Sequence, residues 1–237
     1  MLAGAMATGL AQAGADIAIL DVSKEGADAR AAAIEALGRG AIGVACDATS
    51  KTGLEQALAT VLARFGHVDI LLNAAGVNSG TPFFEISEAE WQRILNIDLT
   101  SVFLACQVFG KAMVDAGKGG SIINISSASS GPPLSKVFTY AVAKAGVNQI
   151  TQFLARELAP HKVRVNAILP GFFPAEQNRK LLTDERVASI LGHTPMNRFG
   201  ESAELVGAAV YLASHQASSF VTGSILRVDG GFTAMTI

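Results

Sequence analysis

Short apolar runs alternate along the chain with longer segments whose apolar residues recur every three or four positions. The short runs are nearly continuous, which is typical of strands buried on both faces of a parallel sheet. The pattern predicts strands at Asp16–Asp21, Ala41–Cys46, Val68–Leu72, Ser121–Ile125, Val163–Ile168 and Ser224–Val228. It predicts helices at Lys24–Leu37, Thr52–Arg64, Glu88–Val114, Thr139–Leu158, Glu176–Leu191 and Ala203–Ser214.

Strict alternation of strands and helices indicates right-handed β-α-β crossovers and a doubly wound parallel sheet in three layers. Neither an internal repeat nor a linker rich in Pro, Gly or Ser interrupts the pattern, so we expect one domain over residues 1–237. Ser87 and Glu90 have the spacing of a capping box at the start of the helix Glu88–Val114. The chain opens with a helical stripe of Leu2, Met6 and Leu10, without a strand ahead of it.

Composition narrows the class of protein. Half of the residues are apolar, the formal net charge is -2, and the charges of both signs are interspersed, so nothing favours a nucleic-acid partner. Cys46 and Cys106 lie in apolar segments and are expected to be buried thiols. The chain has neither a secretory signal nor an apolar run of about 18 residues, so we expect no membrane span and a cytoplasmic location. The four histidines have no metal-ligand spacing, and we expect no metal.

Tyr140 and Lys144 are the first candidates for chemistry. They lie four residues apart in a predicted helix, so their side chains share one face. A free tyrosine has a pKa of about 10, which is too high for a base at neutral pH. A neighbouring ammonium favours the phenolate, so the pair predicts a tyrosine with a lowered pKa that exchanges a proton with an alcohol. The pattern alone is weak, because many amphipathic helices carry such a pair.

The context strengthens that interpretation. Ser127 lies thirteen residues before Tyr140 and just after the predicted strand Ser121–Ile125. Asn73–Gly76 and Pro170-Gly171 also follow predicted strands. Ligands of open α/β sheets bind beyond the carboxyl ends of the strands, so these groups are expected at one edge of the sheet.

Taken in order, the motifs resemble those of the short-chain dehydrogenase/reductase superfamily, which implies a Rossmann-like fold. The resemblance covers essentially the whole chain and rests on the segments Asn73–Gly76, Asn124–Ser127, Tyr140 with Lys144, Arg164–Asn166 with Pro170-Gly171, and Thr222-Gly223 with Val228–Gly231. It implies an NAD-dependent enzyme that acts on CH–OH groups. In it, Tyr140 is the general acid/base, Lys144 lowers its pKa and holds the nicotinamide ribose, and Ser127 positions the substrate oxygen.

Asp21 bears on the choice of cofactor. It ends a predicted strand, where a carboxylate binds the adenosine ribose diol and repels a 2′-phosphate, which favours NAD over NADP. Asp21-Val22-Ser23 also resembles a helix-capping region, and both roles can coexist. The resemblance implies further cofactor contacts from Leu2, Asp47, Ala48, Asn73, Ala75, Gly76, Tyr140, Lys144, Pro170, Gly171 and Phe173.

Three features depart from the superfamily. Its members open with a strand and a T-G-x-x-x-G-x-G turn, and here Ala3 falls where the last glycine belongs. The missing strand would lie between Asp16–Asp21 and Val68–Leu72, so we expect a start placed downstream or a truncated product. Asp98 occupies the position of a catalytic asparagine that holds a water in a proton relay, and aspartate can hold one too, as an acceptor. Ala175 replaces a threonine that contacts the nicotinamide.

The segments 171–179 and 193–200 resemble members described as D-mannonate oxidoreductases or fructuronate reductases. A sugar acid needs a partner for its carboxylate, and Arg179 offers a bidentate one, although it is equally typical of a solvated helix residue. Gln177, Asn178, Asn78 and Ser127 are the other candidate substrate contacts. Other specificities remain open, namely a 3-oxoacyl thioester reductase or a polyol dehydrogenase, as does a non-catalytic subunit. The resemblance also implies a homotetramer that is formed through Glu88–Val114 and Thr139–Leu158.

Overall fold

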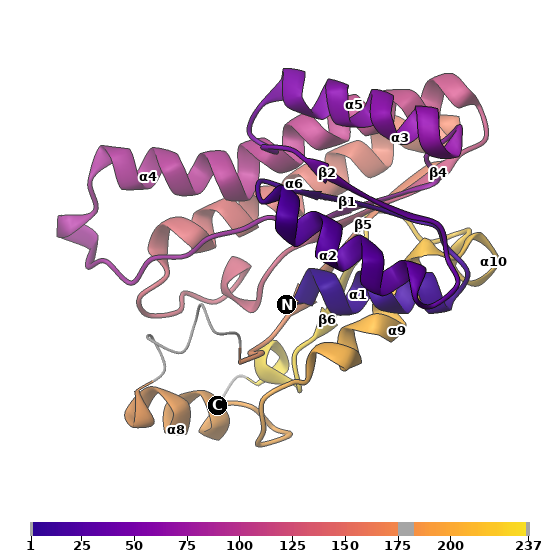
Figure 1. Cartoon of the computed structure of the whole chain (residues 1–237). Coiled ribbons are helices and arrows are strands. Elements are labelled where there is room, and N and C mark those ends of the chain that lie inside the picture. The colour runs from indigo at the N-terminus through magenta and orange to yellow at the C-terminus, as the bar shows by residue number, and fades with distance from the viewer. Residues whose placement is uncertain (1, 175–182, 236–237) are drawn as a thin grey trace.

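The protein is described from a computed structural model that covers residues 2–174 and 183–235. In these ranges the strands are β1 (Ile17–Asp21), β2 (Ala41–Ala45), β3 (Ile70–Asn73), β4 (Gly120–Ile125), β5 (Val163–Pro170) and β6 (Ile225–Val228). The longer helices are α1 (Leu2–Gln12), α2 (Lys24–Glu35), α3 (Lys51–Phe65), α4 (Glu88–Leu95), α5 (Ser101–Ala116), α6 (Phe138–Leu158), α8 (Asp184–Gly192) and α9 (Val206–Ala213). A short helix, α10 (His215–Ser218), follows α9 (Figure 1).

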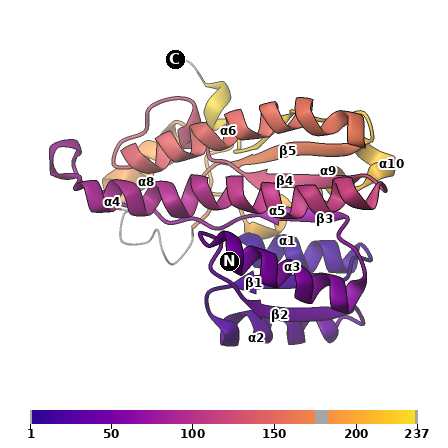
Figure 2. The ribbon, with the colours of Figure 1, turned by 90° about the horizontal axis from the view of Figure 1, so that it is seen from above.

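The strands form two parallel groups, with the order β1-β2 in one and β3-β4-β5-β6 in the other. Figure 2 shows β1 and β2 set apart from β3, β4 and β5. Every residue of β5 is buried, whereas the residues of β1 are half-buried or exposed. The mostly apolar sequence of β5 fits this position, since helices cover both faces of that strand, and its two polar side chains, Arg164 and Asn166, are hydrogen-bonded.

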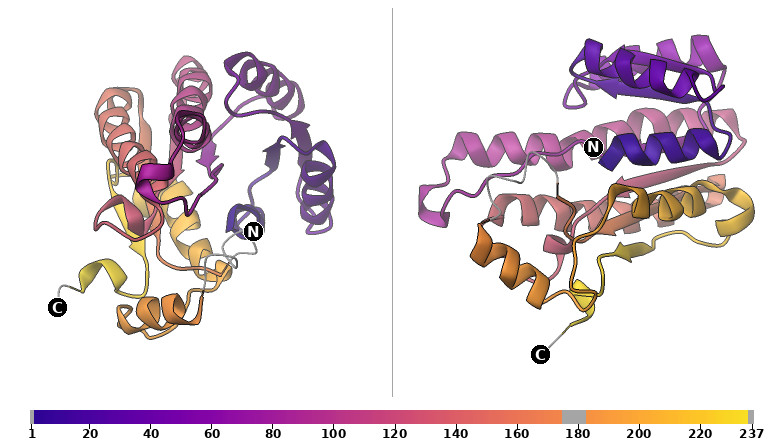
Figure 3. Two further views of the ribbon diagram at one scale, coloured as in Figure 1. Left: turned by 90° about the vertical axis from the view of Figure 1, so that its left-hand side faces the viewer. Right: turned by 60° about the horizontal axis from the view of Figure 1, so that its bottom comes forward.

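Helices cover the strands on two faces, which makes three layers (Figure 3). Successive residues of β4 supply both cores: Ile123 packs with Met6, Leu205 and Leu212 under α1 and α9, while the side chain of Ile122 packs under α5 and α6. Both isoleucines are completely buried, as the two-residue period of a strand requires when both faces are covered. The predicted doubly wound α/β fold is confirmed.

The long helix Glu88–Val114 predicted from the sequence forms and extends to Ala116, but its hydrogen bonding is not α-helical throughout. A π-helical segment, η2 (Asn96–Thr100), separates α4 from α5. Ser87 caps α4 by accepting from the backbone nitrogen of Glu90, but the Glu90 carboxylate instead accepts from Thr81, so only half of the capping box forms. Of the predicted helix Glu176–Leu191, residues 176–182 lie outside the described ranges, and α8 accounts for the rest.

Taken together, Glu88–Ala116 is long and apolar enough to cross a membrane by length and composition, with a mean hydropathy of 1.4 in its most apolar window. Half of that window is buried inside the protein. Its α5 part packs against α3, α6 and the strands β3, β4 and β5. The apolar character of this helix is therefore used for packing within the fold.

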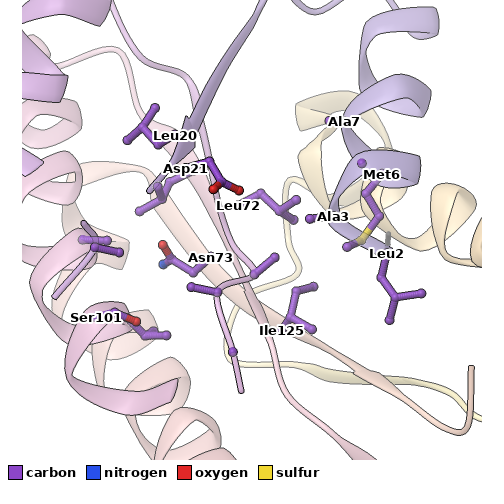
Figure 4. Close-up of a pocket in the computed structure, with 18 of the residues that line it drawn as sticks. Leu2, Ala3, Met6, Ala7, Leu20, Asp21, Leu72, Asn73, Ser101 and Ile125 are labelled. Carbon is purple, nitrogen blue, oxygen red and sulfur yellow. The ribbon is translucent and has the colours of Figure 1, made fainter. Parts of the chain in front are cut away.

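A large cavity lies between the two groups of strands. It is lined by β1 and β3, by the first turns of α1, and by the carboxyl ends of β4 and β5, and its volume is about 2030 Å³. Figure 4 shows Leu2, Met6, Asp21 and Leu72 around it. Ligand pockets usually measure about 300–1,000 Å³, so the space exceeds that of one small ligand. Among the described residues, the sheet divides at the position where the sequence predicts an interruption.

Candidate active site

Tyr140 and Lys144 lie one turn apart on α6 and share a face, as the sequence predicts. The ammonium nitrogen of Lys144 is 5.5 Å from the centre of the Tyr140 ring. Lys144 is only 3% exposed, and Tyr140 is half-buried. Both side chains line the large cavity, so a molecule in the cavity can reach them.

Ser127 joins this pair from the neighbouring strand. It follows β4, and its hydroxyl accepts hydrogen bonds from the backbone nitrogen of Ser129 at 3.2 Å and from the Ser129 hydroxyl at 3.0 Å. Ser127 lies close enough to Tyr140 to lower the pKa of its phenol. The turn after β4 thus fixes one hydroxyl beside the phenol, and the three predicted groups come together.

Asp98 is the fourth charged or polar group of this cluster. It lies on η2 and is completely buried. One carboxylate oxygen accepts from the backbone nitrogen of Val77 at 2.9 Å, and the other lies 3.4 Å from the ammonium of Lys144. That second oxygen has no hydrogen bond in the described residues. A buried acceptor of this kind calls for a water or a ligand atom as its partner.

Asp98 is closely packed against Gly76 and Lys144. A Cβ atom on Gly76 would come within 2.7 Å of the Asp98 carboxylate, so a larger residue in the turn after β3 would displace that carboxylate. Lys144 also donates to the carbonyl oxygen of Ile125 at 3.1 Å. The ammonium is therefore held between the end of β4 and the π-helical segment.

The electrostatics of the cluster differ from the sequence prediction. Burial raises the pKa of Tyr140 to about 12, the hydrogen bond with Ser127 lowers it, and the negative charge of Asp98 raises it. The pKa of Tyr140 is thus raised in the protein without a bound ligand, where the sequence analysis expects Lys144 to lower it, and burial is the largest cause. The ammonium of Lys144 faces the carboxylate of Asp98. Burial lowers the pKa of Lys144, and the negative charge of Asp98 raises it. Burial raises the pKa of Asp98, and the positive charge of Lys144 lowers it.

The predicted cofactor residues line the same cavity. Asp21 ends β1, and one of its carboxylate oxygens accepts from the backbone nitrogen of Ser23, which caps α2. The capping and cavity-lining positions of Asp21 therefore coexist (Figure 4). Asp47 follows β2, next to Ala48, and accepts from the backbone and hydroxyl of Thr49, which lowers its pKa. Cys46 precedes it and is buried.

Asn73 has a second role that the sequence does not reveal. Its side-chain nitrogen donates to Asn124 at 2.9 Å and to the sulfur of Cys106, and Asn124 donates to Thr151. This chain of polar groups crosses from β3 through β4 to α6 in the interior. Because buried polar groups must be paired, the network fixes the strand ends that carry Ser127 and Gly76.

The segment after β5 closes one side of the cavity. Pro170 ends the strand, and the backbone nitrogen of Gly171 donates to Val228 at 2.9 Å. A Cβ atom on Gly171 would lie 2.6 Å from the Cα atom of Asp229, so a larger residue would separate the two segments. Phe173 is buried and lines the cavity, as do Ala75 and, at the start of α1, Leu2 and Ala3.

Of the predicted substrate residues, the structure places Asn78 and Ser127 on the cavity wall. Gln177, Asn178 and Arg179 lie outside the described residues, as does Ala175. A residue that the sequence analysis missed, Arg186 on α8, also lines the cavity. In the part of the chain that the structure describes, the His, Cys, Asp and Glu side chains form no group of three or more that could hold a metal ion.

Comparisons with known proteins identify relatives along the whole chain. A family model described as "Enoyl-(Acyl carrier protein) reductase" matches residues 2–233. The 2-dehydro-3-deoxy-D-gluconate 5-dehydrogenase of Escherichia coli (strain K12) is 38% identical over 230 residues, which are 97% of this chain and 90% of the relative. The chain belongs to the short-chain dehydrogenase/reductase family.

Solved structures of this family superpose closely on the protein. A gluconate 5-dehydrogenase from Burkholderia cenocepacia, in complex with NADP and tartrate, is 32% identical with a TM-score of 0.95 and covers 100% of this chain and 92% of its own. A Haemophilus protein provisionally described as a D-mannonate oxidoreductase, with bound NAD, is 35% identical with a TM-score of 0.93 and has the same coverage. The Rossmann-like fold of a short-chain dehydrogenase/reductase is thus confirmed, and the relatives include both NAD and NADP complexes.

Proposed function

We propose that the protein is an NAD-dependent oxidoreductase that interconverts a secondary alcohol and a ketone on a sugar acid of the D-mannonate/D-fructuronate type. The observation that carries the proposal is the contact of Tyr140, Ser127 and Lys144 on the wall of one cavity. The substrate class is supported by relatives that are described as acting on gluconate derivatives or mannonate.

In this proposal Tyr140 transfers the proton to and from the substrate oxygen. Ser127 donates a hydrogen bond to the same oxygen and holds it beside the phenol. Lys144 holds the cofactor ribose from the buried end of the site, where Ile125 and Asp98 fix its ammonium. The nicotinamide ring supplies or accepts the hydride when it is bound.

The raised pKa of Tyr140 favours one direction of proton transfer. A phenol with a pKa of about 12 is protonated at neutral pH, so it is ready to deliver a proton to a carbonyl oxygen. Oxidation of an alcohol needs the phenolate and therefore a positive charge near the ring. We infer that the rate of ketone reduction near pH 7 needs no prior deprotonation of Tyr140, and that the rate of alcohol oxidation rises with pH as the phenolate forms.

Asp98 takes the place of the asparagine found in many family members. Its free carboxylate oxygen is positioned to hold a water, as the sequence analysis expects, and its charge balances that of Lys144. Since both groups are buried, each stabilises the ionised form of the other. The pair keeps the net charge of the pocket floor near zero before a cofactor arrives.

The residues present fit a dinucleotide. Asp21, Asp47, Tyr140 and Lys144 line one cavity, and so do Leu2 and Ala3 in the first turn of α1. Helix N-termini favour anions such as a pyrophosphate. Asp21 carries the proposed preference for NAD, because a carboxylate repels a 2′-phosphate.

The proposed homotetramer is supported by apolar side chains on the two helices that the resemblance implicates. Phe103 on α5 is 46% exposed, and Phe153 on α6 is 63% exposed. Large aromatic side chains on a protein surface are typical of interfaces. Sedimentation equilibrium tests the assembly: a monomer at micromolar concentration contradicts it.

The function is tested by following NADH at 340 nm with a panel of substrates. The panel contains D-fructuronate and 5-keto-D-gluconate as sugar acids, D-fructose as a neutral ketone and a 3-oxoacyl thioester as an acyl substrate. We expect turnover of a sugar acid with NADH and at least ten times less with NADPH. Turnover of the acyl or neutral substrate alone would favour the corresponding alternative enzyme, and failure to bind NADH at all would leave a non-catalytic subunit.

A further inference from the structure

Arg186 occupies an unusual position for a charged residue. It lies in the first turn of α8, lines the cavity together with Tyr140, and is half-buried. A cation in the first turn is unfavourable to the helix dipole, which prefers acidic residues there. Asp184 and Glu185 meet that preference, so Arg186 does not serve the helix. Its contacts are therefore the reason to look for another role.

The guanidinium of Arg186 is held in place by one serine. Its two terminal nitrogens donate to the hydroxyl and to the carbonyl oxygen of Ser135, each at 2.9 Å. Ser135 lies in the segment that leads into α6, five residues before Tyr140. The two bonds thus fix the plane of the guanidinium beside the helix that carries the phenol.

These bonds leave part of the guanidinium available. The group has five N–H donors, and Ser135 takes two of them. Among residues 2–174 and 183–235 the structure records no carboxylate within ion-pair distance of Arg186. Arg198 differs because it is paired with a carboxylate: its two terminal nitrogens donate to the carboxylate oxygens of Glu204 at 2.8 and 2.6 Å. Within the described residues, Arg186 therefore brings to the cavity wall an oriented positive charge that is not paired with a carboxylate.

We propose that Arg186, oriented by Ser135, binds the carboxylate of the substrate and so selects sugar acids over neutral sugars. A planar guanidinium matches a carboxylate, and its remaining donors suit that geometry. The proposal rests on the proposed function and names the group that recognises its substrate class. It assigns to Arg186 the contact for which the sequence analysis nominates Arg179.

The test compares two ketones that differ only at one carbon, D-fructuronate with a carboxylate and D-fructose with a hydroxymethyl group. The measured quantity is the ratio of kcat/KM for the acid to kcat/KM for the neutral sugar. Arg186→Gln removes the charge, and we expect the ratio to fall about ten- to one-hundred-fold, mainly through a higher KM for the acid. Arg186→Lys keeps the positive charge but loses the two parallel N–H donors of the guanidinium. Its ratio should lie between those of Arg186→Gln and the wild type.

Three further variants separate recognition from structure. Ser135→Ala removes one of the two tethers and should lower the ratio only a few-fold. Arg93→Gln removes another cavity-lining arginine, and Arg179→Gln removes the residue nominated from the sequence; neither should change the ratio. Thermal melting of each variant monitors folding separately from activity.

The outcomes are distinct. An equal loss with both ketones in Arg186→Gln means a purely structural tether and overturns the proposal. A selective loss confined to Arg93→Gln or Arg179→Gln moves the carboxylate contact to that residue and also overturns it. Wild-type protein that binds NADH but reduces no sugar acid overturns the proposed function itself, and this inference with it.

Discussion

The two groups of strands differ in how far their residues are buried and in how many neighbouring strands they pair with. In the four-stranded part, β4 and β5 are buried on both faces, and polar groups such as Asn124 and Arg164 are paired in the interior. In the two-stranded part, which Figure 2 shows set apart from β3, β4 and β5, β1 pairs with β2. The residues of β1 also line the cavity. The proposed proton-transfer groups all belong to the first part, while Asp21 and Asp47 belong to the second.

This difference suggests a division between proton transfer, in the four-stranded part, and cofactor binding, which also involves the two-stranded part. Chemistry needs side chains that are fixed before the substrate arrives, and the four-stranded part provides them through packing. Binding of a cofactor needs contacts along its length, and Asp21 and Asp47 of the two-stranded part are among the proposed ones. We expect the first part to determine the rate and the second to respond to the cofactor.

The largest expected effect tests whether the two parts act separately. Tyr140→Phe removes only the phenolic oxygen, so kcat should fall by about 10²–10⁴-fold because proton transfer is lost. The Kd for NADH, measured by fluorescence titration, should change less than about two-fold, since the variant loses one hydroxyl and keeps the other proposed cofactor contacts. Retained turnover would contradict the assigned role of Tyr140, and lost NADH binding would break the division between the parts.

A matched pair of core substitutions compares the packing of the two parts. Ile123 on β4 is fully buried, whereas Ile19 on β1 is half-buried. Ile123→Ala should lower the free energy of unfolding by about 2–5 kcal/mol, and Ile19→Ala by about 1–2 kcal/mol, because less surface is buried there. Urea unfolding measures both values, and equal losses would show that the two parts are equally well packed.

Cofactor binding should stabilise the two parts unequally. At an NADH concentration of about 100 times its Kd, the protein should gain about 2.7 kcal/mol in unfolding free energy. Hydrogen exchange resolves where the gain occurs, and we expect added protection mainly in the amides of β1 and of the first turn of α1. Uniform protection of β1 and β5 would instead mean that the whole fold tightens together.

The smallest effect concerns the charge on the floor of the pocket. The carboxylate of Asp98 raises the pKa of Tyr140, so Asp98→Asn should lower that pKa. The pH profile of alcohol oxidation then moves to lower pH, because the phenolate forms earlier. Asp115→Asn is the control: its carboxylate is exposed and pairs with Lys111. A profile that moves to higher pH would contradict the charge balance we assign to Asp98 and Lys144.

Much of the fold follows from local sequence. The continuous apolar runs predict all six described strands to within two or three residues, because strands buried on both faces tolerate few polar side chains. The π-helical segment Asn96–Thr100 does not follow, since one extra residue in a helical turn leaves the surrounding periodicity nearly unchanged. That segment places Asp98 against Lys144.

The site is predictable in its members but not in its electrostatics. Motif order brings Ser127, Tyr140 and Lys144 together, as the structure shows. The direction of the Tyr140 pKa depends on burial and on a carboxylate from a distant segment, neither of which spacing reveals. Arg186 is missed for a similar reason, because in the sequence it is one arginine among several on helices, and only its contact with Ser135 distinguishes it.

The two buried cysteines make local opening of the protein measurable by thiol labelling. Cys46 lies where β2 ends, and Cys106 lies on α5 against Asn73, so each thiol belongs to a different part of the sheet. Burial raises the pKa of both thiols, that of Cys106 to about 12, and alkylating reagents attack only exposed thiolates. Cys46 packs against α3 and α5, so its labelling reports separation of these helices from β2, whereas labelling of Cys106 reports opening of the core under α5 and α6.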